Sequence, residues 1–179
     1  AVKAKPVIIL KGGTTTSGAS AIRLHTGSLA GSRAVWDSVC RQAGVLQVHS
    51  LPQMIDTIQA FTYLKPPAGR RVGIIGVGGG SNVLAADDCE RAGLVLPELP
   101  EALKQELGRF TPLVGTGLRN PVDTATTIYM NAAELGKTAE VVAAWDGIDM
   151  LFVRLPTLLG VRLGVKSLLD AAEAVIAGV

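Results

Sequence analysis

The chain has 179 residues, enough for one domain or one and a half, and 48% of them are hydrophobic, so a buried core can form. Charged residues make up 18% and the net charge is +2, a balance that argues against a nucleic-acid or membrane-surface binder. The two cysteines, Cys40 and Cys89, fit no metal-ligand spacing, so we expect free thiols, no metal site and a cytoplasmic protein.

The first part of the chain alternates short apolar runs with segments of helical period. The expected elements are a strand over 7–10, a Gly/Thr/Ser-rich loop over 11–20, a helix over 28–43, a strand over 45–48 and a helix after the cap residue Ser50. Two prolines and a glycine within residues 64–70 then predict a boundary between subdomains. The chain does not begin with methionine, and we expect it to be a piece of a longer polypeptide.

The second part continues the alternation of strands and helices. We expect, in order, a strand over 72–77, a helix over 82–92, a strand over 94–96, a helix opened by Pro100, an irregular loop over 111–119, an extended piece over 120–123, a helix over 131–145, a strand over 150–153 and a final helix. Continuous apolar strands between helices indicate an α/β protein with parallel sheets flanked by helices. The second part predicts a flavodoxin-like domain, and the first part a partial α/β subdomain.

Two helix starts are expected to follow strands through glycine-rich loops at the carboxyl edge of a sheet. One lies near Ser28, after the strand over 7–10 and its glycine loop, and the other near Asn82, after Gly78-Gly79-Gly80. A helix N-terminus carries unpaired N–H donors and about half a unit of positive charge, so it attracts anions. The pair predicts a phosphate held between the two turns.

The glycine loop over residues 76–81 also permits other interpretations. Gly76 and Gly78 follow a strand and Glu98 lies about twenty residues further on, as in a dinucleotide-binding fingerprint. Ser81, however, occupies the place of the third glycine. The loop can also be a tight strand-to-helix turn with no ligand, and the sequence leaves these alternatives open.

His25 is the residue with the clearest chemical potential, because imidazole can be a nucleophile, a base or a ligand. A metal site is disfavoured, since the positions three and four residues on are Ser28 and Leu29. The flanking sequence also lacks the Gly-x-Ser-x-Gly pattern of a serine hydrolase. A phosphoryl carrier and a merely structural or exposed histidine both remain open, whereas His49 is expected to be an exposed residue ahead of a helix cap.

Several motifs of the chain resemble a known family. They are KPVIILKGG at 5–13, HTGSLAG at 25–31, RQAGV at 41–45, the glycines 78–80 and Asn-Pro-Val-Asp at 120–123. Together they look like the ADP-forming acyl-CoA synthetases, relatives of succinyl-CoA synthetase. The resemblance implies that residues 1–64 are the C-terminal half of a histidine-loop flavodoxin-like subdomain, 65–71 a linker and 72–179 a second flavodoxin-like ligase subdomain.

The resemblance also implies a phosphoryl relay, in which an acyl phosphate passes its phosphoryl group to a histidine and then to ADP, or the reverse. By this likeness His25 is the catalytic phosphoryl carrier. The implied phosphate-binding residues are Thr26, Gly27 and Ser28 in one turn and Gly79, Gly80, Ser81 and Asn82 in the other. Asn120 and Asp123 are implied to lie close to the substrate.

The resemblance further implies cofactors and partners that this chain does not supply. ATP or ADP, coenzyme A and Mg²⁺ are expected to bind mainly to a CoA-binding domain and an ATP-grasp domain, in the same chain or in other subunits of an oligomer. The chain departs from the family at Leu24, at Gly13 and over Thr124–Thr127. A non-catalytic regulatory or scaffold module and a plain nucleotide-binding domain are the competing hypotheses, and retention of His25 favours catalysis.

Overall fold

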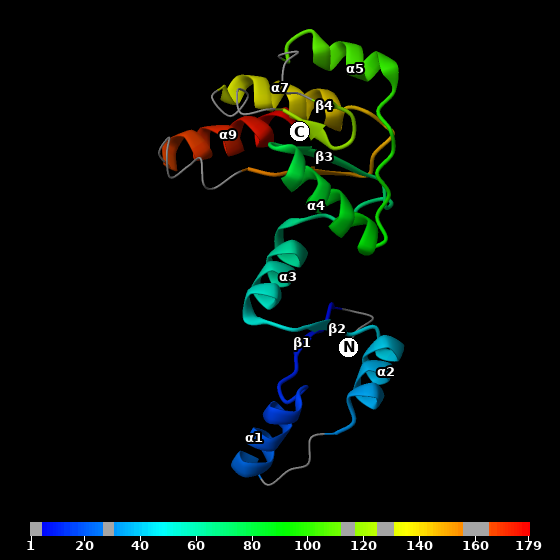
Figure 1. Cartoon of the computed structure of the whole chain (residues 1–179), viewed down its shortest axis with the longest axis vertical. Coiled ribbons are helices and arrows are strands. Elements are labelled where there is room, and N and C mark those ends of the chain that lie inside the picture. Colours follow the sequence, from blue (N-terminus) through cyan, green and yellow to red (C-terminus); the bar gives the residue numbers. More distant parts are fainter. Residues whose placement is uncertain (1–4, 27–30, 112–116, 125–130, 156–164) are drawn as a thin grey trace. The chain divides into compact units, whose positions relative to one another are not determined.

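The computed structural model of the chain contains two compact units, Ala1–Pro66 and Pro67–Val179 (Figure 1). The structure describes residues 5–26, 31–111, 117–124, 131–155 and 165–179.

The first unit has a two-stranded sheet and three helices. Its elements are β1 (Ile8–Leu10), α1 (Thr16–Thr26), α2 (Arg33–Ala43), β2 (Leu46–Val48) and α3 (Leu51–Tyr63). The strands β1 and β2 pair in parallel, with Ile8 opposite Leu46 and Leu10 opposite Val48. Both strands confirm the sequence prediction to within one residue.

Helix α1 corrects the prediction of a loop over residues 11–20. The Thr15 hydroxyl oxygen accepts a hydrogen bond from the Gly18 N–H at 3.1 Å, and this side-chain cap starts a helix where Ser, Thr and Gly indicated a loop. Helix α2 also begins later than expected, at Arg33 after the N-cap Ser32, instead of at Ser28. Its end at Gly44, which has φ of 68°, matches the prediction.

Helix α3 confirms its predicted start at Ser50. The Ser50 hydroxyl accepts a bond from the Gln53 N–H at 3.2 Å, while the Gln53 side chain accepts one from the His49 N–H at 2.8 Å. The two bonds satisfy donors that a helix start would otherwise leave unpaired. His49 is exposed ahead of this cap, as the sequence predicted.

The apolar stripe of α3 is exposed within this unit. Leu51, Ile55 and Ile58 are 64%, 53% and 46% exposed. Among the described residues of the unit, only Cys40 and Val48 are buried. A two-stranded sheet is too small to cover three amphipathic helices, so the unit is the incomplete α/β subdomain that the sequence indicated.

The second unit is built on a four-stranded sheet in the order β4-β5-β3-β6. Its elements are β3 (Val72–Gly76), α4 (Gly79–Arg91), α5 (Glu101–Gly108), β4 (Gly117–Leu118), β5 (Val122–Asp123), α7 (Ala132–Ala143), β6 (Met150–Val153) and α9 (Val165–Gly178). Strand β3 pairs in parallel with both β5 and β6, and β4 runs antiparallel to β5. The unit thus confirms an α/β fold with a mainly parallel sheet.

Two expected elements of this unit differ from the prediction. The stretch 94–96 is no strand, because only Val95 pairs with the sheet, through an isolated bridge to Arg71. The loop expected over 111–119 includes β4, whose residues Gly117 and Leu118 pair with Asp123 and Val122. Segments of two or three residues are too short for an apolar pattern to distinguish a strand from a loop.

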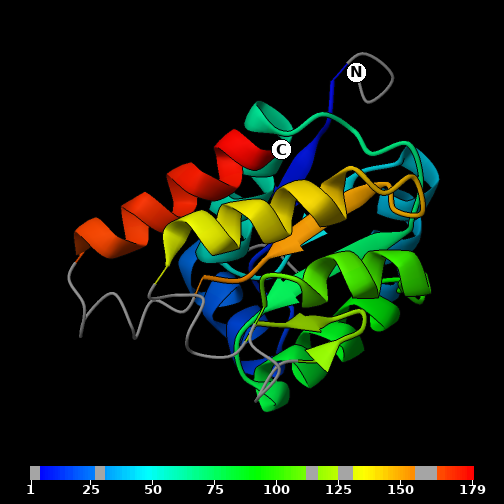
Figure 2. The ribbon, with the colours of Figure 1, turned by 90° about the horizontal axis from the view of Figure 1, so that it is seen from above.

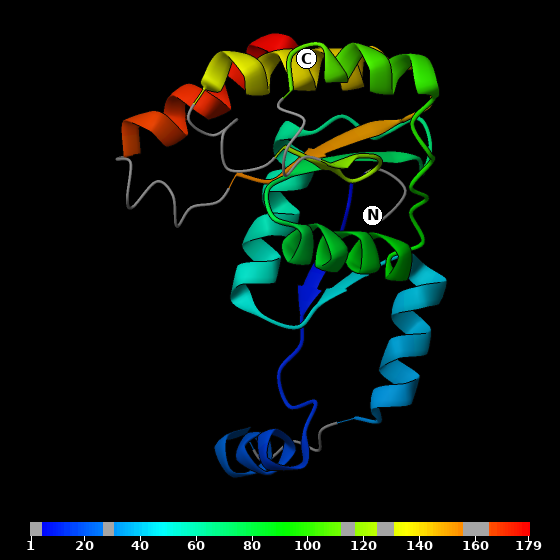
Figure 3. The ribbon, with the colours of Figure 1, turned by 45° about the horizontal axis from the view of Figure 1, so that its top comes forward.

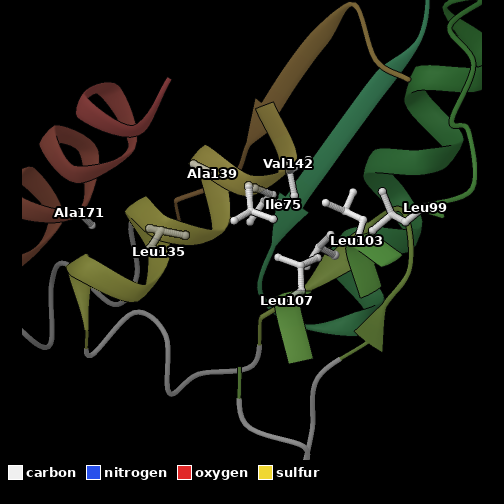
Figure 4. Close-up of a cluster of buried hydrophobic side chains, with 10 residues drawn as sticks. Ile75, Leu99, Leu103, Leu107, Leu135, Ala139, Val142 and Ala171 are labelled. Atoms are coloured by element: carbon white, nitrogen blue, oxygen red, sulfur yellow. The ribbon is translucent and has the colours of Figure 1, made fainter. Parts of the chain in front are cut away.

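Helices cover both faces of the sheet, with α4 on one side and α5, α7 and α9 on the other (Figure 3). Val72 and Ile74 pack towards α4, and Ile75 packs among side chains of α5 and α7, including Leu107 and Val142 (Figure 4). All five residues of β3 are buried. The central position of β3 fixes where its carboxyl end, and the turn that follows, can lie.

Helices α7 and α9 lie side by side in a close contact made possible by glycine (Figure 2). A Cβ added to Gly136 would lie 2.7 Å from the carbonyl oxygen of Ala174. No side chain fits at that distance without a shift of one backbone.

The described parts of the chain hold two free cysteines, Cys40 in α2 and Cys89 in α4, as expected. Partial burial raises the pKa of the Cys89 thiol, and the nearby Asp88 carboxylate adds to this. Within the described ranges no helix has the length and apolarity needed to cross a membrane.

Candidate functional site

The turn from β3 to α4 lies at the carboxyl end of the sheet. Gly78, the N-cap of α4, has φ of 84°, a backbone conformation that residues other than glycine rarely adopt. The helix begins at Gly79, three residues earlier than predicted. The three glycines therefore form the N-cap and the start of the first turn, and not only the loop before the helix. The N–H groups of Gly79 and Gly80 belong to that first turn, where helices have no internal acceptor.

The Asp123 carboxylate lies beside this turn. Strand β5 pairs Asp123 with Gly76, and the carboxylate oxygen Oδ1 accepts a bond from the Gly78 N–H at 3.2 Å. Thr124 holds the strand end in place, since its N–H donates to the Gly76 carbonyl at 3.0 Å and its hydroxyl to the same oxygen at 3.3 Å. A carboxylate at this place is stabilised by the positive end of the α4 dipole.

The two polar side chains of the first helical turn differ in their hydrogen bonding. The Ser81 hydroxyl donates to the carbonyl oxygens of Val77 and Gly78 at 2.6 and 2.9 Å, so it fastens the turn. Asn82 is only 5% exposed, and within the described part of the chain neither its amide nitrogen nor its amide oxygen has a partner. Each buried polar group without a partner costs about 1–3 kcal/mol of stability. A hydrogen bond from the Asn82 amide to a ligand atom or to water would remove this cost.

Glycine at position 76 makes room for that amide. A Cβ on Gly76 would meet Asn82 Oδ1, which therefore lies directly against the end of β3. The amide thus faces the carboxyl edge of the sheet, beneath the start of α4. This edge is where open α/β sheets bind their ligands.

Asn120 makes hydrogen bonds to the backbone around β3. Its amide nitrogen donates to the carbonyl oxygens of Val72 and Pro97 at 2.8 and 3.0 Å, and its oxygen accepts from the Ile74 N–H at 3.0 Å. The Asn120 side-chain amide thus makes the kind of hydrogen bonds to β3 that a backbone peptide group would make. Pro121 cannot donate such a bond, because it has no N–H. Asn120 lies towards the amino-terminal half of β3, away from the glycine turn, and its proximity to substrate stays a prediction.

His25 is an exposed side chain in the last turn of α1. Thr26, which the resemblance implied to be part of a phosphate-binding turn before a helix, is instead the final residue of α1. Gly27 and Ser28 lie outside the described residues. The side chain of Leu24, the unusual neighbour of the histidine, is 88% exposed.

The structure therefore brings together Gly79, Gly80, Ser81, Asn82 and Asp123 at one sheet edge, while His25 belongs to the other unit. Sequence reasoning missed Arg154, which directly follows β6 and whose N–H donates to the Ile75 carbonyl at 2.8 Å. The signal was available, because a charged residue directly after an apolar parallel strand lies at the carboxyl edge.

Two alternative sites receive no support from the described residues. Glu98, the acid of the dinucleotide interpretation, pairs with Lys104 at 3.0 Å, and this contact lowers the pKa of the carboxyl group. Among the residues in the described ranges, no three His, Cys, Asp or Glu side chains are grouped as a metal site requires.

Comparison with known proteins defines the class of both units. Residues 1–61 match the family model of the succinyl-CoA ligase-like flavodoxin domain, and residues 72–145 match that of the ligase-CoA domain. The chain is thus an α/β protein of the succinyl-CoA ligase type.

Individual relatives narrow this class to a family. The chain is 37% identical over 161 residues to the alpha subunit of ADP-forming acetate–CoA ligase II from Pyrococcus furiosus, covering 88% of this chain and 34% of that protein. The chain is 40% identical over 121 residues to the alpha subunit of ADP-forming acetate–CoA ligase I of the same organism, covering 68% of this chain and 26% of that protein. The chain belongs to the family of ADP-forming acyl-CoA synthetases.

A solved structure supports the same assignment. The dinucleotide-forming acetyl-coenzyme A synthetase 1 of Ca. Korarchaeum cryptofilum, in complex with phosphate and ADP, has a TM-score of 0.74 and 31% identity, covering 95% of this chain and 37% of that one. The chain spans about a third of the length of the relatives it matches.

Proposed function

We propose that this chain is part of an NDP-forming acyl-CoA ligase that relays a phosphoryl group through His25. The observation that carries the proposal is the turn Gly78–Asn82, where unpaired helix donors and the orphan Asn82 amide face one sheet edge. His25 supports it, since the side chain is exposed and lies in the segment that the family model of the flavodoxin domain matches.

The proposed chemistry conserves phosphate throughout. Acyl-CoA and inorganic phosphate give an acyl phosphate and free CoA. The P–O bond to the acyl group then breaks as a P–N bond to the His25 imidazole forms, and the carboxylate leaves. ADP finally takes the phosphoryl group, which regenerates the neutral imidazole, and the reverse sequence makes acyl-CoA from ATP.

Within this proposal, the glycine turn stabilises the transferring phosphoryl group. The N–H groups of Gly79 and Gly80 and the α4 dipole supply fixed positive potential, which needs no reorganisation during transfer. Asp123 beside the turn adds a carboxylate there, which already accepts the Gly78 N–H.

The proposed partners are a CoA-binding domain and an ATP-grasp domain, in the same chain or in other subunits. ATP or ADP, coenzyme A and Mg²⁺ would bind mainly there. The exposed apolar stripe of α3 supports this proposal, because an isolated unit rarely leaves so large a helix face in water.

The experiment uses the full-length protein with its partner subunits, incubated with γ-labelled ATP and Mg²⁺. We expect an acid-labile, base-stable phosphate on the wild type and on His49→Ala, which removes the second histidine of the present sequence, and a loss of this phosphate in His25→Ala. Equal labelling of the wild type and His25→Ala would refute the relay.

A further inference from the structure

The linker between the two units ends in a close contact with the start of β6. The Asp149 carboxylate accepts bonds from the Arg71 N–H at 2.8 Å and from the Arg71 guanidinium at 2.8 and 3.0 Å. The Arg71 carbonyl oxygen accepts in return from the N–H groups of Asp149 and Met150 at 2.8 and 3.2 Å. The Asp149 side chain is only 10% exposed. These bonds join one linker residue to a segment 78 positions further along the chain.

Two neighbouring linker residues are held as well. Gly69 lies directly against the Asp149 carboxylate, since a Cβ at this position would overlap the carboxylate oxygens. The Arg70 carbonyl oxygen accepts a bond from the Val95 N–H at 2.9 Å. Paired bonds between a guanidinium and a carboxylate are among the stronger and more directional polar contacts. The end of the linker over residues 69–71 is therefore fixed to the second unit.

The remaining connection, residues 65–68, is short and stiff. Its other end follows α3, where the Leu64 N–H donates to the Ala60 carbonyl oxygen at 2.9 Å. The rings of Pro66 and Pro67 fix φ, and each proline also restricts the residue before it. Proline-rich connections act as semi-rigid spacers and not as flexible coils. Such a spacer limits the orientation of one unit against the other only while both of its ends are held.

We propose that Asp149 is a positioning residue, which anchors the linker to the second unit and thereby restricts the arrangements that the two units can adopt. Its catalytic consequence rests on the proposed function. A phosphoryl group on His25 transfers only when it meets its acceptor in the correct orientation, and a misplacement of about 1 Å can cost on the order of 100-fold in rate. Loss of the anchor should therefore lower kcat, whereas the KM of substrates that other domains bind should not change.

The first measurement is limited trypsin digestion of the full-length enzyme with its partner subunits. Trypsin cleaves after arginine, and the bond after Arg70 lies inside the anchor. Cleavage after Arg109, an exposed residue at the end of α5, reports general unfolding. Relative to it, we expect Asp149→Ala and Gly69→Ala to speed cleavage after Arg70 by about fivefold or more. Gly136→Ala, which disturbs the α7–α9 contact of the same unit, is the matched control and should leave this ratio within about twofold.

The second measurement is the steady-state kinetics of the same variants, at a temperature at which each of them is folded. We expect kcat of Asp149→Ala and Gly69→Ala to fall about tenfold, while KM for acyl-CoA stays within about twofold of wild type. Gly136→Ala should keep both values. A merely structural tie would lower the melting temperature without this loss of kcat.

Two results would overturn the proposal. One is an unchanged cleavage ratio in Asp149→Ala, which would mean that the linker stays fixed without the carboxylate. The other is faster cleavage after Arg70 with an unchanged kcat, which would leave the anchor without a part in catalysis. Labelling of His25 from ATP is measured separately in the wild type. A labelled wild type with either result would reject the positioning role and leave the proposed relay standing, whereas an unlabelled wild type would reject the relay itself.

Discussion

Replacing Asn120 by alanine tests whether this side chain serves as a substitute peptide group. The change removes three hydrogen bonds, to Val72, Ile74 and Pro97, with lengths of 2.8 to 3.0 Å. Each group left unpaired costs about 1–3 kcal/mol when buried, and these are partly buried, so we expect a loss of about 3 kcal/mol in the free energy of unfolding. For a protein of this size that is roughly 6–12 °C in melting temperature.

The assay is urea unfolding and thermal melting of the chain, with Asn131→Ala as the matched control. Asn131 caps α7 through one long bond of 3.4 Å to the Glu134 N–H, and its loss should cost about 1 kcal/mol or less. Asn120→Asp should be as damaging as Asn120→Ala at neutral pH, because a carboxylate oxygen would face two carbonyl oxygens. An Asn120→Ala variant no less stable than Asn131→Ala would refute the reasoning.

Two further predictions concern packing and pH. Gly136→Ala should destabilise the chain by about 1–3 kcal/mol, because its Cβ would lie 2.7 Å from the Ala174 carbonyl oxygen. Gly80→Ala is the control and should not destabilise the chain, because its Cβ would have no atom within 4 Å. Chemical unfolding of both variants checks this prediction. The Arg71 guanidinium and N–H bond the Asp149 carboxylate at 2.8 to 3.0 Å and lower its pKa from 3.8 to about 2. Because the folded-state pKa is the lower one, this stabilisation is fully present above about pH 4 and is lost as the pH falls towards 2. Urea midpoints from pH 5 to pH 2 should fall less steeply for Asp149→Asn than for the wild type, and parallel curves would contradict the assignment.

The sequence predicted those elements whose signal is strong and local. Strands β3 and β6 are continuous apolar runs, and α3 begins at a Ser-x-x-Gln cap, so period and capping chemistry were sufficient. Helix α1 was missed because Thr16, Ser17 and Gly18 are poor helix formers. The Thr15 cap that starts this helix is apparent only in the structure.

The candidate site was predictable in part. A glycine run after a buried strand indicated the turn at Gly78–Asn82, and the structure has a helix N-terminus there. The Asn82 amide lacks a hydrogen-bond partner within the described part of the chain, and Arg154 lies close to Gly76. Both facts depend on how β3, β6 and α4 pack, which no local sequence pattern encodes. The backbone role of Asn120 likewise depends on contacts with residues 23 to 48 positions away in the chain.

The most direct test of the account is phosphohistidine mapping by mass spectrometry, after the full-length enzyme has reacted with acyl-CoA and phosphate in the absence of ADP. The account predicts that phosphate accumulates on His25 and on no other residue. It also predicts that added ADP removes this phosphate with formation of ATP. An enzyme that makes ATP while His25 stays unmodified, or that remains active as His25→Ala, would contradict the central claim.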